Sequence, residues 1–372
     1  MIPKYILDKI EQDNIFFSKF KRKDFYIPNY NPLNHYLCLT ENKYFVALLC
    51  LRSHIKSITD YYFGTLVDAR SVDLFMLTSS VSSPVGLGSN SEVVVAKLGN
   101  IDSFLTDSSQ FGFEPLLLNE FDKVYCYMPS MRGENCDKRH LNQFFHCEIE
   151  IRGELDVVKK IAEEYVKIMC ETILASSNII RLISANVSRT KEVLEKVMLG
   201  KKFQNISFDE AVEILEKKGL SNLVNYTFHG RDICSDGEIQ LMKQLNTDMP
   251  VWLNNFDRDI VPFYQKPDKN NQEKTVNADF LFPPLQEGAF GGEIIGSGQR
   301  QNLVSEIYES LNRQGIKSEP YEWYINLRRQ KNYSITSGFG LGIERFISWA
   351  LGFDDIKKTI IYPRIKNIKT FP

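Results

Sequence analysis

Several features that define common protein classes are missing from the 372-residue sequence. Its longest apolar run, residues 45–51, is far shorter than the roughly 20 residues that a membrane-spanning helix needs. Forty-five basic and forty-seven acidic residues give a net charge of −2, without the basic excess of most nucleic-acid-binding proteins. Charges interrupt the first segment, MIPKYILDKIEQDN, unlike a secretory signal. We therefore expect a cytoplasmic protein with no membrane partner.

Cysteine and histidine motifs that hold metals are also missing. None of the seven cysteines has CxxC spacing, and the five histidines form no HxxxH or HExxH pair. An odd number of cysteines without such spacing is typical of reduced, mostly buried thiols in a cytosolic protein. The sequence therefore predicts neither a disulfide framework nor a zinc site.

Alternating strand-like and helix-like segments are present instead. Residues 1–45 show no sustained period, and we interpret them as an N-terminal extension that wraps a core. Runs of strands interrupted by long helices predict an α+β fold with a largely antiparallel sheet. The predicted segments are helices at 46–70, 154–184, 208–219 and 301–313, a loop and then a strand at 81–99, a long-looped hairpin at 122–151, a polar hairpin tip at 265–278, and a Gly-rich strand turning into a helix at 337–352.

A group of cations follows the first strand of the 122–151 hairpin. Arg132 and Glu134 end that strand, and Lys138, Arg139 and His140 lie in the charged loop after it. Several cations on one loop could hold a polyphosphate, because an arginine fork matches phosphate oxygens bidentately. A solvated hairpin tip is the alternative for this pattern taken alone.

Two carboxylates lie in an otherwise apolar, Gly-rich stretch. Asp279 and Glu293 are expected on neighbouring strands, an arrangement that suits Mg²⁺ held together with substrate phosphates. Two surface acids are the alternative. Arg300 follows Glu293 by seven residues, so in a regular strand the two side chains would lie on opposite faces.

Alternate glycines mark the last predicted strand. Gly338, Gly340 and Gly342 remove every side chain from one strand face, so that a planar ligand or a backbone can approach closely. Arg345, just inside the following helix, could reach the same cavity. The spacing G-x-G-x-G differs from the dinucleotide-binding fingerprint G-x-G-x-x-G.

The order of these motifs resembles the catalytic core of class II aminoacyl-tRNA synthetases, in particular the asparaginyl/aspartyl subgroup. The resemblance runs from about residue 46 to residue 372. In chain order, the segments that carry it are RSHIKSITDYYF for the first motif, LTDSSQFGFE, SMRGENCDKRHLNQFFHCEIEI for the second motif, GGEIIGSGQR, and SGFGLGIERFISWALGFDDIKKTIIYPR for the third motif.

The resemblance implies a class II synthetase fold over residues 46–372, with a six- or seven-stranded, mainly antiparallel sheet flanked by helices. It implies ATP as co-substrate, Mg²⁺, and a homodimer formed through residues 46–75. Arg132 and Arg345 would be the catalytic pair. The residues implied for ATP are Arg132, Glu134, Arg139, His140, Phe144, Gly340, Gly342 and Arg345; those for Mg²⁺ are Asp279 and Glu293; those for the amino-acid substrate are Ser108, Gln110, Glu148 and Arg300.

The sequence also departs from this family. Forty-five residues before the first motif cannot supply the family's anticodon-binding barrel, so tRNA is not favoured as a partner. Phe113 stands where aspartyl enzymes have a lysine, so the chain looks asparaginyl there. The segment SSPVGLGSNSE, residues 82–92, replaces an acidic segment that contacts the substrate amine, and Thr336 replaces a histidine.

These departures favour an asparagine-synthetase-like function. In this hypothesis an AMP-forming ligase activates an aspartate-like carboxylate with ATP and passes it to ammonia or a small amine. One alternative is a minimal asparaginyl/aspartyl-tRNA synthetase-like enzyme that acylates an RNA without reading an anticodon. Another is a catalytically silent, ATP-binding regulatory paralogue.

Overall fold

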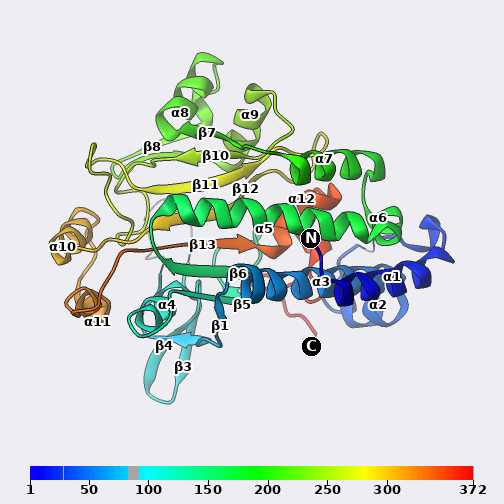
Figure 1. Cartoon of the computed structure of the whole chain (residues 1–372), viewed down its shortest axis with the longest axis horizontal. Helices are drawn as coiled ribbons and strands as arrows, with labels where there is room; N and C mark the ends of the chain where they lie inside the picture. Colours follow the sequence, from blue (N-terminus) through cyan, green and yellow to red (C-terminus); the bar gives the residue numbers. More distant parts are fainter. Residues whose placement is uncertain (28, 83–91, 372) are drawn as a thin grey trace.

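One large mixed sheet organises the chain, of which the computed structural model describes residues 1–27, 29–82 and 92–371 (Figure 1). The α+β fold is as predicted, but this sheet has eight strands in the described part of the chain instead of six or seven, because short edge strands are added in parallel at both ends. In sheet order the strands are β1 (Arg70–Ser71), β5 (Lys123–Met131), β6 (Gln143–Arg152), β13 (Thr336–Gly342), β12 (Gly292–Gln299), β11 (Asn277–Phe282), β10 (Val251–Asn254) and β7 (Gln204–Ser207).

Helices cover one face of the sheet and form the main core with it. In Figure 1 the long helix α5 (Leu155–Ala175) runs along the sheet, with α3 (Lys43–Tyr61) beside it. Leu341 of β13 and Cys147 of β6 are fully buried in the same hydrophobic cluster as Tyr165 of α5. Because side chains alternate along a strand, the neighbours of these core residues point to the opposite face, where the site lies.

The N-terminal residues are more helical than predicted. They form α1 (Lys4–Ser18) and α2 (His35–Glu41), and α1 buries Ile6, Ile10 and Phe17 in the main hydrophobic cluster. Buried His54 joins α1 to the core, since its two ring nitrogens lie 2.9 Å from an Asp13 carboxylate oxygen and 2.9 Å from the Ser176 hydroxyl.

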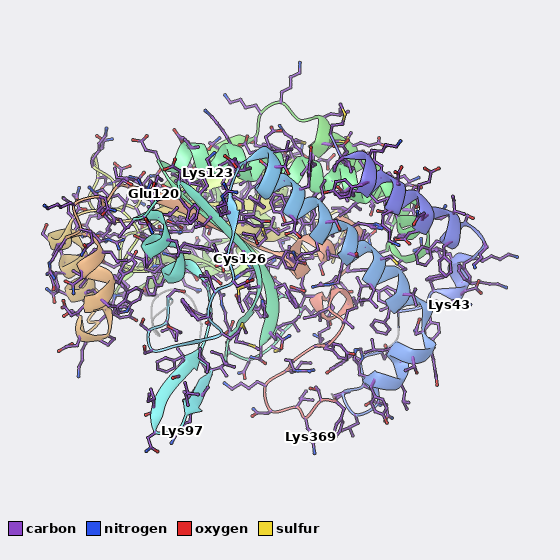
Figure 2. All side chains as sticks on the ribbon, turned by 60° about the horizontal axis from the view of Figure 1, so that its bottom comes forward. Lys43, Lys97, Glu120, Lys123, Cys126 and Lys369 are labelled. Carbon is purple, nitrogen blue, oxygen red and sulfur yellow. The ribbon has the colours of Figure 1, made fainter. Side chains whose placement is uncertain are left out.

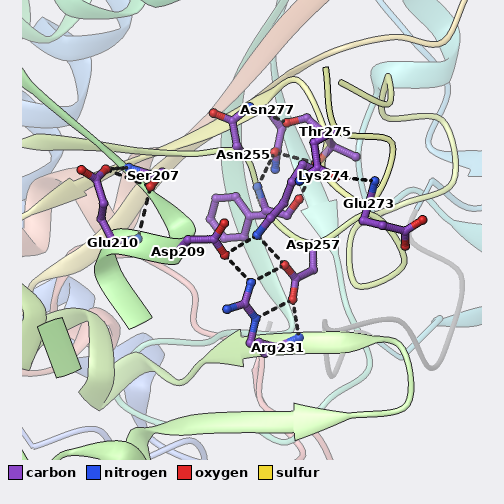
Figure 3. A network of polar contacts seen from close by, with 12 residues as sticks. Ser207, Asp209, Glu210, Arg231, Asn255, Asp257, Glu273, Lys274, Thr275 and Asn277 are labelled. Atoms are coloured by element: carbon purple, nitrogen blue, oxygen red, sulfur yellow. Dashed lines mark hydrogen bonds and ion pairs between the residues drawn. The ribbon is translucent and has the colours of Figure 1, made fainter. Parts of the chain in front are cut away.

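A small α/β module at residues 204–245 extends the far edge of the sheet. It comprises β7, α8 (Phe208–Lys217), β8 (Val224–Thr227), β9 (Gly230–Ile233) and α9 (Ser235–Leu245), and it has its own hydrophobic cluster. Figure 3 shows how charges tie it to the neighbouring loops. Asp257 accepts from Arg231 Nε at 2.9 Å and lies 2.7 Å from Lys274 Nζ, and both cations also pair with Asp209.

A hairpin projects from the opposite side of the sheet. Strands β3 (Val95–Leu98) and β4 (Ile101–Leu105) pair with each other, and β2 (Leu77–Thr78) pairs with β4. Lys97 lies near its tip (Figure 2). Most of the segment at residues 82–92, where a loop was predicted, falls at residues 83–91 and lies outside the described residues.

Most of the remaining predicted elements are present, but two predicted helices have other bounds. The predicted helix at 46–70 begins earlier, at Lys43, and ends as a π-helical turn at Leu66, and Arg70 already belongs to strand β1. The predicted helix at 154–184 is interrupted at Ser176, which separates α5 from α6. All seven cysteines are free, and among the described residues no helix is both long and apolar enough to span a membrane.

The other helices are α4 (Gln110–Leu117), α6 (Ser177–Ile183), α7 (Val187–Leu199), α10 (Val304–Arg313), α11 (Glu322–Leu327), α12 (Ile343–Leu351), a π-helical turn (Tyr62–Leu66) and 3₁₀ turns at Arg22–Asp24, Ser221–Leu223, Glu319–Tyr321 and Ile356–Thr359.

Candidate active site

Glycines make the centre of the open sheet face flat. On β13, Gly338, Gly340 and Gly342 pair with Glu150, Glu148 and His146 of β6. On the other side, Gly340 pairs with Gly296 of β12, and Gly338 pairs with Gly298. Two neighbouring strands therefore present backbone instead of side chains, and side chains from the surrounding strands can lie over this floor.

Two acidic side chains converge over one of these glycines. Asp279 of β11 pairs with Gly296, and a β-bulge at Ile294 interrupts the register between β11 and β12. A Cβ atom on Gly296 would lie 3.2 Å from Glu293 Oε1 and 3.6 Å from Asp279 Oδ1. The two carboxylates predicted for Mg²⁺ therefore lie together on the open face.

The same bulge determines the orientation of Arg300 relative to Glu293. The extra residue in β12 shifts the alternation by one position, so Glu293 and Arg300 share a face although seven residues separate them. Both side chains line one pocket. Opposite faces were expected only for a regular strand, and the bulge shows that this stretch is irregular.

The first pocket lies at the β6–β13–α12 end of the glycine floor. It encloses about 530 Å³ of space, part of it open to solvent. Phe144 from β6 and Arg345 from α12 line it, and the Arg132 guanidinium carbon lies 5.4 Å from the Phe144 ring centroid. The side chains and glycines that line it include all eight residues predicted for ATP: Arg132, Glu134, Arg139, His140, Phe144, Gly340, Gly342 and Arg345.

Some polar side chains in this pocket are paired with each other, and others have buried atoms without a partner in the described part of the chain. Arg345 Nη1 lies 2.8 Å from Glu293 Oε2. The Nε atom of Arg132 and the Oε2 atom of Glu134 are buried and have no hydrogen-bond partner among the described residues. Since a buried polar atom without a partner is unfavourable, these atoms indicate where a polar ligand would bind.

Burial and neighbouring charges shift the pKa values of the two converging acids in opposite directions. Burial alone would raise the pKa of Glu293, but Arg345 and the other nearby arginines hold it below its ordinary value. Burial and the Glu293 charge raise the pKa of Asp279. A cation would relieve this repulsion, and carboxylate oxygens are ligands that Mg²⁺ prefers.

These acids fit a magnesium ion that is shared with a phosphate ligand. Within the described ranges no cluster of three or more His, Cys, Asp or Glu residues could hold a metal by itself. Mg²⁺ usually takes one or two protein carboxylates together with substrate phosphates and water, so a pair of acids beside an arginine-lined pocket suits this ion.

Glu238, which the sequence analysis did not select, fixes two parts of this pocket. Its Oε2 atom lies 3.1 Å from Arg139 Nη2 and accepts a hydrogen bond from the Glu293 backbone N–H at 3.0 Å. Arg139 also donates to the Gly291 carbonyl oxygen. Burial raises the pKa of Glu238 to about 7, against the opposing effect of Arg139. Because Glu238 comes from α9 of a separate module, its spacing in the sequence carried no signal.

His140 belongs to the charged loop and is turned partly to solvent. Its Nδ1 atom lies 2.9 Å from an Asp137 carboxylate oxygen, which also accepts the His140 backbone N–H at 2.8 Å. Burial and the Arg345 charge lower the pKa of His140. The side chain still lines the first pocket, so the loop closes one side of it.

A second pocket adjoins the first and shares four of its residues. Arg132, His146, Glu293 and Gly340 line both pockets. The second pocket contains all four residues predicted to face the amino acid: Ser108, Gln110, Glu148 and Arg300.

Glu148 and Arg300 are already engaged by protein groups. Glu148 accepts hydrogen bonds from the Ser108 hydroxyl and, at 2.8 Å, from the Ser109 backbone N–H. Arg300 forms a bidentate pair with Glu150, with N–O distances of 3.0 and 2.8 Å. Both members of this pair are buried, so the charge of Arg300 is balanced before any ligand binds.

His146 is a second residue that sequence reasoning missed. It lies between the two pockets, with Nδ1 3.0 Å from the Ser130 hydroxyl and the ring edge-on to Phe144 at a centroid distance of 4.7 Å. Burial, together with Arg132 and Arg345, lowers its pKa well below the ordinary value. The alternation through Phe144 and Glu148 on β6 was the signal that could have identified it.

The arrangement defines the class of protein. A glycine-floored antiparallel sheet carries one pocket lined by arginines beside an acid pair, and a polar pocket adjoins it. The family model of class II tRNA synthetases (D, K and N) matches residues 39–366. The chain belongs to this family, and within it to the catalytic core of the asparaginyl/aspartyl subgroup.

Curated relatives include two archaeal asparagine–tRNA ligases. The one from Thermococcus kodakarensis is 32% identical over 264 residues, which is 70% of this chain and 57% of the relative. The one from Pyrococcus abyssi is 32% identical over 265 residues, which is 70% of this chain and 56% of the relative. The chain thus spans a little over half the length of the curated relatives it matches.

A solved structure confirms the fold. Asparaginyl-tRNA synthetase from Pyrococcus horikoshii, complexed with asparaginyl-adenylate, aligns with a TM-score of 0.79 and 26% identity, covering 94% of this chain and 76% of that one. The asparaginyl-tRNA synthetase of Entamoeba histolytica aligns with a TM-score of 0.75 and 21% identity, covering 92% of this chain and 73% of that one.

The comparisons overturn the expected partners. The relatives named above are asparagine–tRNA ligases, so the expectation that tRNA is not favoured and that ammonia or a small amine accepts an aspartate-like group is wrong. The error came from treating the short stretch before residue 46 and a near-zero net charge as evidence against tRNA. Net charge does not describe the local charge around a site.

Proposed function

We propose that this chain activates asparagine with ATP as asparaginyl-adenylate and transfers the asparaginyl group to tRNA. The observation that carries the proposal is the junction of two pockets on one glycine floor. Arg132 and Glu293 line both, so a nucleotide in the first pocket and an amino acid in the second would meet beside these residues.

The chemistry asks little covalent work of the protein. A carboxylate oxygen of the amino acid attacks the α-phosphorus of ATP, the bond from that phosphorus to the bridging oxygen breaks, and pyrophosphate leaves. A ribose hydroxyl of the tRNA 3′ end then attacks the activated carbonyl carbon and AMP leaves. Positioning and stabilisation of the developing charge provide most of the rate in such transfers.

The residues of the first pocket have separate tasks in this proposal. Arg132 contacts the α-phosphate, and Glu134 accepts from the adenine amino group. Phe144 and Arg345 enclose the adenine ring from two sides, with Gly340 beneath it and Gly342 beside Arg345. Arg139 and His140 close the loop over the phosphates. The buried, unpartnered atoms of Arg132 and Glu134 support the first two assignments.

Asp279 and Glu293 are the proposed Mg²⁺ ligands. When bound, Mg²⁺ would neutralise charge on the leaving pyrophosphate. Arg345 holds Glu293 Oε2 at 2.8 Å and leaves Oε1 directed at the space above Gly296, where Asp279 also points.

Asparagine is the amino acid that the second pocket favours. Glu148 is surrounded by Ser108 and the Ser109 N–H, and Arg300 is neutralised by Glu150. Buried Phe113 also lines this pocket. In the subgroup that the sequence resembles, aspartyl enzymes have a lysine at this position, so Phe113 supports the amide over the acid.

Further assignments remain part of the proposal. The tRNA partner is carried over from relatives that are longer than the matched region. We also propose residues 1–45 as an N-terminal extension and residues 46–372 as the catalytic domain.

A homodimer through residues 46–75 is a further part of the proposal. Val46, Leu49 and Leu66 are exposed apolar side chains in this segment.

Two assays test this function. Asparagine-dependent exchange of labelled pyrophosphate into ATP should require Mg²⁺, and labelled asparagine should become acid-precipitable when tRNA is added. Exchange without charging of any tRNA would refute the transfer step. AMP formation that requires aspartate and ammonia, and does not occur with asparagine, would refute the choice of amino acid.

A further inference from the structure

Gln265 is a glutamine of the second pocket with no role in the proposed mechanism. It lies in the loop between β10 and β11, and its backbone N–H donates to the Pro262 carbonyl oxygen at 3.0 Å. An antiparallel bridge pairs it with Arg300. Because residues paired across antiparallel strands point to the same face, Gln265 and Arg300 share the open face of the sheet.

The side-chain amide of Gln265 lies directly over Gly298 of the glycine floor. A Cβ atom on Gly298 would collide with that amide, as a Cβ atom on neighbouring Gly338 would collide with the Glu150 carboxylate. Gly298 and Gly338 are themselves a cross-strand pair. The amide and the carboxylate are therefore neighbours at one end of the pocket.

One polar atom of this amide has no protein partner. Gln265 Oε1 is buried and makes no hydrogen bond with any described residue, and Gln110 Nε2, in the same pocket, is also buried without a partner. One is an acceptor and the other a donor. Since buried polar groups normally find partners, a ligand group that both donates and accepts would satisfy them.

Charge at this end of the pocket excludes an anionic ligand group. The Arg300–Glu150 pair is bidentate and buried, so it carries no net charge. A carboxylate placed beside it would be a buried charge without a counter-ion, whereas a carboxamide would add none. A carboxamide also supplies both the donor and the acceptor that Gln265 and Gln110 lack.

We infer that Gln265 contacts the side-chain carboxamide of the substrate amino acid and helps to select it over a carboxylate. The inference rests on the proposed function and deepens it by naming a specificity-determining residue that the sequence analysis did not select. Gln265 lies outside the ATP pocket, so its contribution falls on the amino acid and not on the nucleotide.

The test compares Gln265→Met with Gln12→Met in pyrophosphate exchange. Methionine keeps the length of the side chain and removes its hydrogen bonds, and exposed Gln12 on α1 is a matched control far from the site. Loss of one neutral hydrogen bond typically changes binding roughly 3- to 10-fold. We expect KM for asparagine to rise by about this factor in Gln265→Met, with KM for ATP unchanged and Gln12→Met like the wild type.

A second variant keeps the inference testable if Gln265→Met fails to fold. Gln265→Glu keeps the shape and one acceptor but adds a negative charge, so we expect it to lower kcat/KM for aspartate more than for asparagine. Unchanged KM for asparagine in Gln265→Met, or equal loss for both amino acids in Gln265→Glu, would overturn the inference. Wild-type protein inactive with asparagine would instead overturn the proposed function.

Discussion

Alanine substitutions at Gly340 and Gly338 test whether each glycine of the floor is needed for ligand binding or for folding. At Gly340 a Cβ atom would lie 3.5 Å from Glu148 Cγ and 3.7 Å from Glu148 Oε1, which are ordinary van der Waals distances. At Gly338 it would collide with the Glu150 side chain and the Ile149 backbone carbonyl. The fold can therefore accommodate Gly340→Ala, whereas Gly338→Ala forces the backbone to move.

The methyl group in Gly340→Ala occupies space that the ligand needs. Gly340 lines both pockets, so a bound nucleotide would be displaced from the floor. Overpacking by one or a few methyl groups typically costs about 1–3 kcal/mol, which corresponds to a loss of roughly 5- to 150-fold in affinity. The free energy of unfolding should change by less than about 1 kcal/mol, because the added atom makes no contact shorter than 3.5 Å.

Calorimetric titration with ATP and urea unfolding measure the two effects separately. We expect Gly340→Ala to unfold like the wild type and to bind ATP at least fivefold more weakly, and Gly338→Ala to be destabilised. Wild-type ATP affinity in a folded Gly340→Ala protein would refute the idea that the nucleotide lies on this floor.

Three further changes test other parts of the site and its supports. Glu238→Ala should raise KM for ATP roughly tenfold, because Arg139 and the N–H of Glu293 lose their shared acceptor. Glu238→Gln keeps an acceptor oxygen and should stay much closer to the wild type. Equal defects in both variants would contradict a hydrogen-bonding role. Asp257→Asn should lower the free energy of unfolding by about 1–2 kcal/mol at pH 7: burial opposes the shift, but Arg231 and Lys274 lower the pKa of Asp257 to about 2, and solvent screens part of this effect at a half-buried site. Since the folded-state pKa is below the unfolded value, this contribution is complete above about pH 4 and is lost as the pH falls towards 2; a stability difference that persists at pH 2 in urea titrations would contradict it. Arg300→Lys should impair exchange with asparagine more than tenfold while KM for ATP stays constant, because lysine cannot reproduce the bidentate pair; unchanged kinetics would exclude Arg300 from the amino-acid pocket.

The sequence motifs predicted the central sheet, and the residues that they selected lie together on it. Local spacing was sufficient for the 122–151 hairpin and for the glycines at 338, 340 and 342. Successive side chains point to opposite faces of a strand, so the spacing between two residues tells whether they share a face. The eight residues expected around ATP accordingly line one pocket, and the four expected around the amino acid line its neighbour.

What the sequence could not predict depends on irregular or long-range structure. The bulge at Ile294 places Glu293 and Arg300 on one face, against simple parity. Glu238 reaches Arg139 from a module 99 residues further along the chain. Helix α1 is stabilised by burying Ile6, Ile10 and Phe17 against the core rather than by a clear period in the sequence.

The partner prediction failed for a different reason. It used the length before residue 46 and the net charge of the whole chain, neither of which describes the surface next to the site. Motif order was the more informative signal, since the family match covers residues 39–366 and most of the segments named in the sequence analysis lie within that range.

The most direct measurement is asparagine-dependent exchange of labelled pyrophosphate into ATP by the wild type and by Arg132→Ala, each first shown to be folded by urea titration. The wild type should catalyse exchange only with Mg²⁺ and asparagine present, and Arg132→Ala should lose at least a hundredfold in rate, the usual order for one charge-stabilising group. A folded wild type without exchange, or an Arg132→Ala protein as active as the wild type, would contradict amino-acid activation at this site.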